Sequence, residues 1–150
     1  MKWRAVIKNP EVIGRNQELL WYEPKELRVA NPILAIHGMW GKYRLWEYYA
    51  DFFCNRGFRF IAPTLRYHFP GNQRVKELGR TSVNDYVADI AQLIRYLSEC
   101  GLPAMQIDPL PPPIVFGHSM GGLIAQKIAS YGIASLTVLL NSAPPAGVSL

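Results

Sequence analysis

Residues 113–125 constrain the fold of this chain more than any other stretch. Residues 114–116 are apolar and have the composition of the end of a buried strand, and apolar side chains recur at helical spacing from residue 123 onward. The sequence Gly-His-Ser-Met-Gly lies between them, at residues 117–121. The stretch therefore predicts a strand, a tight turn with Ser119 at its apex, and a helix.

This arrangement suits a serine that acts as a nucleophile. A serine hydroxyl needs a base to remove its proton, and it must stand clear of the sheet so that base and substrate can reach it. A turn this sharp strains the serine backbone, and side chains two residues before and after it would collide, which favours glycine at Gly117 and Gly121. Helix entry after Ser119 leaves the Met120 amide free to bind a developing oxyanion. A tight structural turn with an unreactive serine is the alternative.

A second glycine motif follows an earlier apolar run. Residues 33–36 are apolar without alternation, which is typical of a strand covered on both faces. His37 and Gly38 follow this run directly, and Met39 comes next. Because His37-Gly38 and Ser119 both fall at the carboxyl ends of predicted parallel strands, the two motifs are expected to share one site.

Together, the two motifs resemble the α/β-hydrolase fold family. The resemblance runs from about residue 31 to residue 145 in the family's order, and it includes a third strand with its exit loop at 60–66. It implies that Ser119 is the family's nucleophile and that the Met39 amide is a second oxyanion-hole donor beside Met120. The residues expected to shape and support the two turns are His37, Gly38, Gly117, His118 and Gly121.

The order of the predicted elements indicates the fold class. Strands are expected at 3–7, 19–22, 33–36, 58–62, 114–116 and 134–140, and helices at 43–56, at 83–99 and after Ser119. This alternation predicts an α/β fold that is α/β-hydrolase-like, with a mostly parallel sheet and helices on both faces.

Three local predictions can be compared directly with a structure. The apolar stripe of the first helix is expected to face the core; it consists of Leu45, Tyr49, Phe52 and Phe53. Ser82 is expected to cap the second helix, with Asp85 in its first turn. Residues 64–80 are expected to form a long polar loop, and the resemblance places this loop at the mouth of the active site.

Length and composition fit a single domain, residues 1–150. The chain has 150 residues, of which 49% are hydrophobic and 18% charged, as in globular proteins. Its formal net charge of +5 comes from scattered basic residues, so nucleic-acid binding is not favoured. Cys54 and Cys100 match no metal-ligand spacing and are expected to be free thiols.

No stretch is long and apolar enough to be a membrane span, and residues 1–4 lack the apolar core of a signal peptide. The expected location is therefore the cytoplasm.

The residues after Ser119 depart from the family's pattern. The family's chain order is serine, then acid, then histidine, yet residues 120–150 contain no His, Asp or Glu. Among the histidines, His37 is expected to brace its loop and His68 to lie on a surface loop, although either could have a functional role. His118 adjoins the serine, and the elbow turns neighbouring side chains apart.

The strand at 134–140 would form an uncovered sheet edge. The chain is therefore expected to be a partial domain that lacks its C-terminal strands and to self-associate through this edge.

The sequence predicts a serine hydrolase that cleaves a carboxylic ester or similar acyl bond of a small molecule through an acyl-enzyme, weakly active or inactive in this form. No cofactor or metal is expected. Two alternatives stay open at this point: a non-catalytic hydrolase-like module that binds an acyl ligand or a protein partner, and an acyltransferase of the same fold.

Overall fold

The computed structural model describes residues 3–8, 18–68 and 75–147, and the statements below concern these residues. The strands are β1 (Trp3–Lys8), β2 (Glu18–Glu23), β3 (Val29–Ile36), β4 (Phe58–Pro63), β5 (Ile114–His118) and β6 (Leu136–Leu140). The α-helices are α2 (Glu47–Cys54), α3 (Val75–Arg80), α4 (Val83–Cys100) and α5 (Met120–Ser130), and the 3-10 helices are η1 (Tyr43–Trp46) and η2 (Pro103–Met105).

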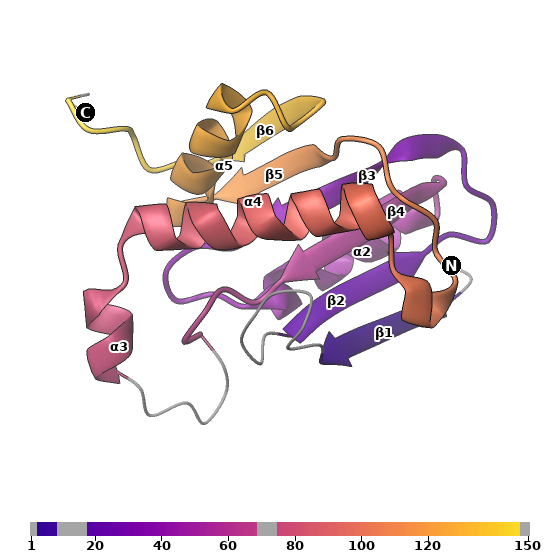
Figure 1. Ribbon diagram of the computed structural model, residues 1–150, viewed down its shortest axis with the longest axis horizontal. Helices are drawn as coiled ribbons and strands as arrows, with labels where there is room; N and C mark the ends of the chain where they lie inside the picture. Colours follow the sequence, from indigo (N-terminus) through magenta and orange to yellow (C-terminus); the bar gives the residue numbers. More distant parts are fainter. Residues whose placement is uncertain (1–2, 9–17, 69–74, 148–150) are drawn as a thin grey trace.

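The strands form one sheet in the order β1-β2-β4-β3-β5-β6. β1 pairs antiparallel with β2, and β2 antiparallel with β4, whereas the β4-β3, β3-β5 and β5-β6 pairs are parallel. The predicted α/β class is therefore confirmed, with the antiparallel lead-in at one edge and the parallel strands in the rest of the sheet (Figure 1).

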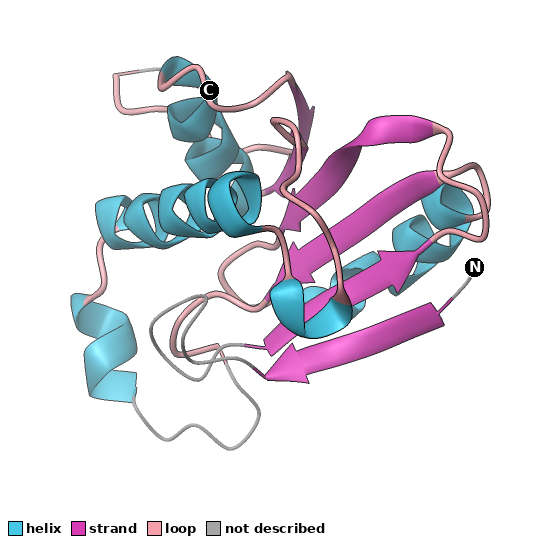
Figure 2. Cartoon of the chain, turned by 45° about the vertical axis from the view of Figure 1, so that its right-hand side comes forward, coloured by secondary structure: helices cyan, strands magenta, loops and turns pink. Residues whose placement is uncertain are grey.

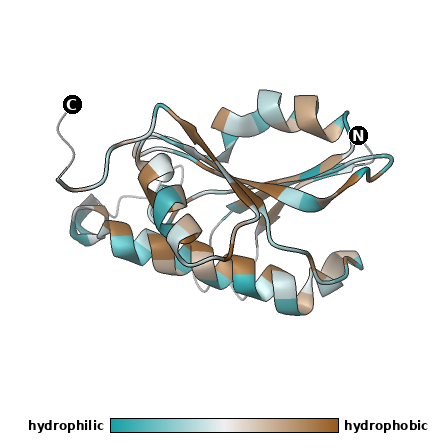
Figure 3. Ribbon diagram, turned by 90° about the horizontal axis from the view of Figure 1, so that it is seen from above, coloured by the Kyte–Doolittle hydropathy of each residue, from teal (hydrophilic) through white to brown (hydrophobic). Residues whose placement is uncertain are grey.

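Helices cover both faces of the sheet. One face carries α4 and α5, whose apolar sides form the larger core with residues such as Ile90, Leu93 and Ile124 (Figure 2). The other face carries η1 and α2, whose core includes Trp46 and Phe60. Viewed along the sheet, α2 lies on one side and α4 on the other, so the molecule has three layers (Figure 3).

Helix α4 follows its sequence pattern closely. The Ser82 hydroxyl accepts a hydrogen bond from the Asp85 amide, and the Asp85 carboxylate accepts one from the Ser82 amide, which makes a reciprocal capping box. The helix ends before Gly101, whose φ of 64° places it in the left-handed region. Both ends of this helix are therefore confirmed to within one residue.

The apolar stripe predicted for the first helix was wrong for three of its four residues, whereas the fourth, Phe53, packs against the core as predicted. Leu45, Tyr49 and Phe52 are 44%, 42% and 51% exposed, and the Arg56 guanidinium lies 3.5 Å from the centre of the Phe52 ring. The buried positions of η1 and α2 are Tyr43, Trp46, Ala50 and Cys54. A 3-10 turn has three residues per turn, so it shifts the phase of the helix, and the small Ala50 and Cys54 then let α2 lie close to the sheet.

Two further boundaries differ from the prediction. β3 begins at Val29 rather than at residue 33, because an irregularity between Val29 and Ile33 accommodates Pro32, which has no amide hydrogen to donate. The predicted polar loop at 64–80 includes residues 69–74, which lie outside the described residues, and its last part, Val75–Arg80, is helix α3. Helix α3 escaped detection because six residues are too few to show an apolar period.

Strand β6 lies at one end of the described sheet order, as predicted. Leu136 and Leu139 are 57% and 44% exposed along it. Self-association through this edge stays a prediction.

Candidate active site

Ser119 occupies the junction between β5 and α5. Its φ of 54° and ψ of −121° lie outside the regions that residues other than glycine normally adopt. The Ser119 amide donates to the Leu140 carbonyl at 3.2 Å, and the Ser119 carbonyl accepts from the amides of Gly122 and Ala143, each at 2.9 Å. The predicted strand, strained turn and helix are therefore confirmed, and bonds to β6 and its exit loop hold the strained residue in place.

Close backbone approaches explain the glycines on either side of the serine. A Cβ atom on Gly117 would lie 2.4 Å from the Gly121 carbonyl oxygen, and a Cβ atom on Gly121 would lie 2.2 Å from the Ile36 carbonyl oxygen. Both distances are far below contact distance, and both neighbours are backbone atoms. Glycine is therefore required where α5 begins against the end of β3.

The exit of β3 lies directly beside the serine. A Cβ atom on Gly38 would come within 2.9 Å of the Ser119 Cβ and 3.4 Å of the His118 Nδ1. The next residue, Met39, is 38% exposed. In the part of the chain that the structure describes, neither the Met39 amide nor the Met120 amide has a hydrogen-bond acceptor. The structure thus brings the two sequence motifs together and leaves two amide donors without acceptors there.

His37 braces the loops behind this site. It is completely buried, and its Nε2 accepts a hydrogen bond from the Leu65 amide at 2.9 Å. Because Nε2 is the acceptor, we assign the proton to Nδ1, which donates to the Gly38 carbonyl at 2.7 Å. Burial lowers the pKa of His37 from 6.5 to about 4. His37 therefore ties the exit of β3 to the exit of β4 and has no free nitrogen for Ser119, in keeping with its predicted bracing role.

This brace makes a prediction about pH. The folded chain keeps His37 neutral down to about pH 4, whereas an unfolded histidine takes up a proton near pH 6.5. The stability that this difference provides is complete above pH 6.5 and is lost as the pH falls toward 4. We expect a loss of about 3 kcal/mol in the free energy of unfolding across this window.

Urea unfolding at a series of pH values measures this loss. The His37→Gln variant should be less stable at neutral pH and should lose most of the slope between pH 6.5 and 4. The His68→Gln variant is the matched control and should keep most of the slope, because burial lowers the pKa of His37 more than the neighbouring His68 does. A slope that is unchanged in His37→Gln would contradict the assignment.

The other two histidines are not positioned against the serine hydroxyl either. The His68 Nδ1 donates to the Arg66 carbonyl at 2.9 Å, and its ring packs edge-on against His37 and Tyr86. The His68 Nε2 and the His118 Nδ1 are buried and have no hydrogen-bond partner in the described residues. Within these residues, no histidine is hydrogen-bonded to Ser119.

Sequence reasoning missed a polar network behind the elbow. The Gln126 side-chain amide donates to the Ser142 hydroxyl at 2.9 Å and to the Ala143 carbonyl at 3.3 Å. Gly122 lies close against Ser142. Because the Ala143 amide also bonds the Ser119 carbonyl, Gln126 supports the loop that holds the serine. The only sequence signal was a polar residue between the buried residues Ala125 and Ile128 of α5.

The described residues contain no group of three or more His, Cys, Asp or Glu side chains that could hold a metal ion. Cys54 and Cys100 are both free thiols, the first buried and the second exposed. None of the helices in the described ranges has the length and apolarity needed to cross a membrane.

Solved structures with the same fold cover nearly all of this chain. The thioesterase domain from the curacin biosynthetic pathway matches 98% of it with a TM-score of 0.69 and 23% identity. A putative lipase from Acinetobacter baumannii matches 98% of the chain with a TM-score of 0.63 and 18% identity. An epoxide hydrolase from Vigna radiata matches 91% of the chain with a TM-score of 0.65 and 16% identity. This chain covers only 48%, 44% and 39% of those three chains, respectively.

No curated protein sequence matches the chain. A family model described as the alpha/beta hydrolase family matches residues 33–150, which include both glycine motifs and the Ser119 turn. The chain therefore belongs to the α/β-hydrolase family.

Proposed function

We propose that this chain carries the nucleophile and oxyanion hole of a serine hydrolase that cleaves a carboxylic ester or a similar acyl bond of a small molecule. The observation that carries the proposal is the backbone of Ser119, which is strained at a strand–helix junction and lies beside Gly38. Strain of this kind persists only where surrounding structure enforces it, and here backbone bonds from Ser119 to Leu140, Gly122 and Ala143 do so. Esterase, lipase and thioesterase names among the structural neighbours are consistent with this chemistry.

In the proposed reaction, the Ser119 Oγ attacks the acyl carbon while a base takes its proton. The negative charge that develops on the carbonyl oxygen is stabilised by the amides of Met39 and Met120, which have no acceptor in the described residues. Collapse expels the alcohol, which takes up a proton, and leaves an acyl-enzyme that water then hydrolyses. His37, Gly38, Gly117, His118 and Gly121 act by holding the two turns together.

The base is the element that the described residues do not supply. His37 uses both ring nitrogens for the backbone, and neither His68 nor His118 bonds to Ser119. The second candidate function is a non-catalytic module that binds an acyl ligand or a protein partner, because such a module needs no base. An acyltransferase would use the same serine and the same oxyanion hole. It differs from a hydrolase in its second substrate, which is another acceptor instead of water.

Fluorophosphonate labelling with an intact-mass readout tests the proposal. A fluorophosphonate reacts with a serine that has an oxyanion hole, so we expect slow addition of a single label to the 150-residue chain. Ser119→Ala should abolish the labelling. Ser130→Ala is the control, because Ser130 is an exposed serine at the other end of α5, and it should label like the parent chain.

Labelling that persists in Ser119→Ala would assign the reactivity to another residue and overturn the proposal. A complete lack of labelling, even at long times, would favour the binding module.

A further inference from the structure

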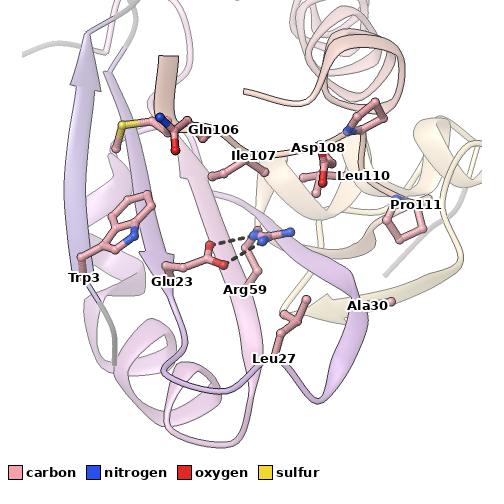
Figure 4. Close-up of a pocket in the computed structure, with 12 residues that line it drawn as sticks. Trp3, Glu23, Leu27, Ala30, Arg59, Gln106, Ile107, Asp108, Leu110 and Pro111 are labelled. Carbon is pink, nitrogen blue, oxygen red and sulfur yellow. Dashed lines mark hydrogen bonds and ion pairs between the residues drawn. The ribbon is translucent and has the colours of Figure 1, made fainter. Parts of the chain in front are cut away.

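A cavity of about 320 Å³ lies at the edge of the sheet opposite Ser119. Ala30 near the start of β3, Arg59 near the start of β4, and Leu110 in the loop before β5 line it (Figure 4). This is the amino-terminal edge of the parallel strands, whereas Ser119 follows the carboxyl end of β5. The cavity is therefore separate from the candidate active site, and nothing argued above accounts for it.

A buried ion pair forms one wall of the cavity. The Arg59 Nε and Nη2 donate to the two carboxylate oxygens of Glu23, both at 2.7 Å, and the side chains are 10% and 12% exposed. The Trp21 indole N–H also donates to the Glu23 carboxylate at 3.0 Å. These bonds hold the guanidinium in one orientation, so its remaining edge is a rigid, preorganised group.

That remaining edge faces the cavity without a protein acceptor. The Arg59 Nη1 has no hydrogen-bond partner among the described residues, and Figure 4 shows the third guanidinium nitrogen turned away from Glu23. Solvent reaches the Arg59 Nη1, because this atom is not one of the buried side-chain atoms that lack a partner. A hydrogen-bond acceptor bound in the cavity could therefore reach this donor and take the place of solvent.

The surrounding charges select the kind of acceptor. Glu23 already neutralises Arg59 and occupies the Nε–Nη2 edge, which is the edge that grips a carboxylate with two bonds. Asp108 adds a further negative charge to the lining. The carboxylates of Glu23 and Asp108 would therefore repel an anion more strongly than the neutralised Arg59 attracts it. An uncharged carbonyl oxygen can accept a hydrogen bond from Nη1 without this repulsion.

The rest of the lining includes several apolar side chains. Leu27, Ile107, Leu110 and Pro111 contribute to it, and Trp3 adds an aromatic ring. Small-molecule sites combine such walls with a few fixed polar groups, and the volume is at the lower end of their range. The cavity therefore suits a compact molecule with one apolar end and one polar end.

We propose that this cavity is a binding site for a small uncharged carbonyl compound of the amide class, whose oxygen accepts from the Arg59 Nη1 and whose apolar end packs on Leu27 and Ile107. The alternative is an ion pair that only joins β2 to β4 and faces solvent. The two readings differ in whether an amide binds saturably, and this does not depend on the reactivity of Ser119.

Isovaleramide and isovalerate are the probes, because they have the same shape and differ in charge. Ligand-observed saturation-transfer NMR measures binding even when the protein self-associates. We expect saturable binding of isovaleramide with half-saturation at about 1–30 mM, as for a ligand of this size. Isovalerate should bind at least about fivefold more weakly, and Asp108→Asn should narrow that difference.

Two variants test the site itself. Arg59→Lys keeps the positive charge beside Glu23 but removes Nη1, and it should reduce isovaleramide binding at least about tenfold. Ala30→Phe fills the cavity and leaves the ion pair intact, so it tests the site even if Arg59→Lys disturbs folding. Ala88→Phe, on the exposed face of α4, is the matched control and should bind like the parent chain.

Three results would each overturn the proposal. They are no saturable binding of isovaleramide to the parent chain, equal binding in Ala30→Phe, and isovalerate binding as tightly as the amide.

Discussion

Replacing Gly121 with alanine is expected to destabilise the chain by about 3 kcal/mol or more. The new Cβ atom would lie 2.2 Å from the Ile36 carbonyl oxygen and 2.6 Å from the His37 carbonyl oxygen. Both atoms belong to the backbone where β3 ends, so no side chain can rotate away. The clash can be relieved only by moving α5 off the sheet, which would also separate Ser119 from Gly38.

Urea unfolding followed by circular dichroism measures this effect. Gly79→Ala is the matched control, because no atom lies within 4 Å of a Cβ at that position and Gly79 lies in helix α3. It should be neutral or stabilise the chain by up to about 1 kcal/mol. A Gly121→Ala variant within about 1 kcal/mol of the parent chain would show that the beginning of α5 is not packed against β3 as described.

Much of the fold could be predicted from the sequence because local motifs mark its close contacts, such as the contact at Gly121. The motif around Ser119 is local, since its strand, turn and helix are consecutive and the glycines mark the close approaches. The capping pair Ser82 and Asp85 is equally local, because its partners are three residues apart. The parallel order then follows from alternating elements, because crossover connections are right-handed and short.

Predictions failed where local pattern and tertiary packing disagree. The aromatic side chains of Tyr49 and Phe52 have the spacing of a buried stripe, but the sheet instead receives Ala50 and Cys54, which let the helix approach more closely. Apolar periodicity alone cannot distinguish these two faces, because both repeat every three or four residues. The choice depends on the space above β4, which the sequence of the helix does not encode.

Some residues of the candidate site could likewise be predicted from the sequence, and others could not. Ser119, Gly38 and the two amide donors could be named from motifs, because each lies at a predicted strand end. The bond from Leu65 to His37 and the support that Gln126 gives to Ala143 could not be named, because each joins segments 17 or more residues apart in the sequence. Neither residue type indicates its partner without a structure.

Simple aryl esters are expected to be hydrolysed very slowly, if at all, by the 150-residue chain. Residues 120–150 contain no His, Asp or Glu, and His37 has both ring nitrogens bound to the backbone. Without a positioned base, Ser119 keeps its proton at neutral pH. In serine proteases, loss of a triad member leaves only the acceleration of about 10³–10⁴ that the oxyanion hole and binding provide.

If only the base is lacking, neutral imidazole added to the solution should replace it in part. General-base assistance contributes about 10²–10⁴ in rate, and an untethered base recovers only a fraction of this, so we expect an increase of about tenfold in the rate of fluorophosphonate labelling. The increase should follow the concentration of neutral imidazole and be absent in Ser119→Ala. The same concentration of 1,3-dimethylimidazolium chloride, which has no basic nitrogen, is the control and should have no effect.

Two outcomes would contradict this account of the missing base. Rapid, stoichiometric labelling without imidazole that disappears in His68→Ala would make His68 the base, reached by a movement of the loop that follows β4. Slow labelling that imidazole does not accelerate would instead indicate that the Met39 and Met120 amides fail to stabilise the oxyanion, since an added base cannot compensate for that loss. The comparison therefore separates a defect in proton transfer from a defect in charge stabilisation at the same serine.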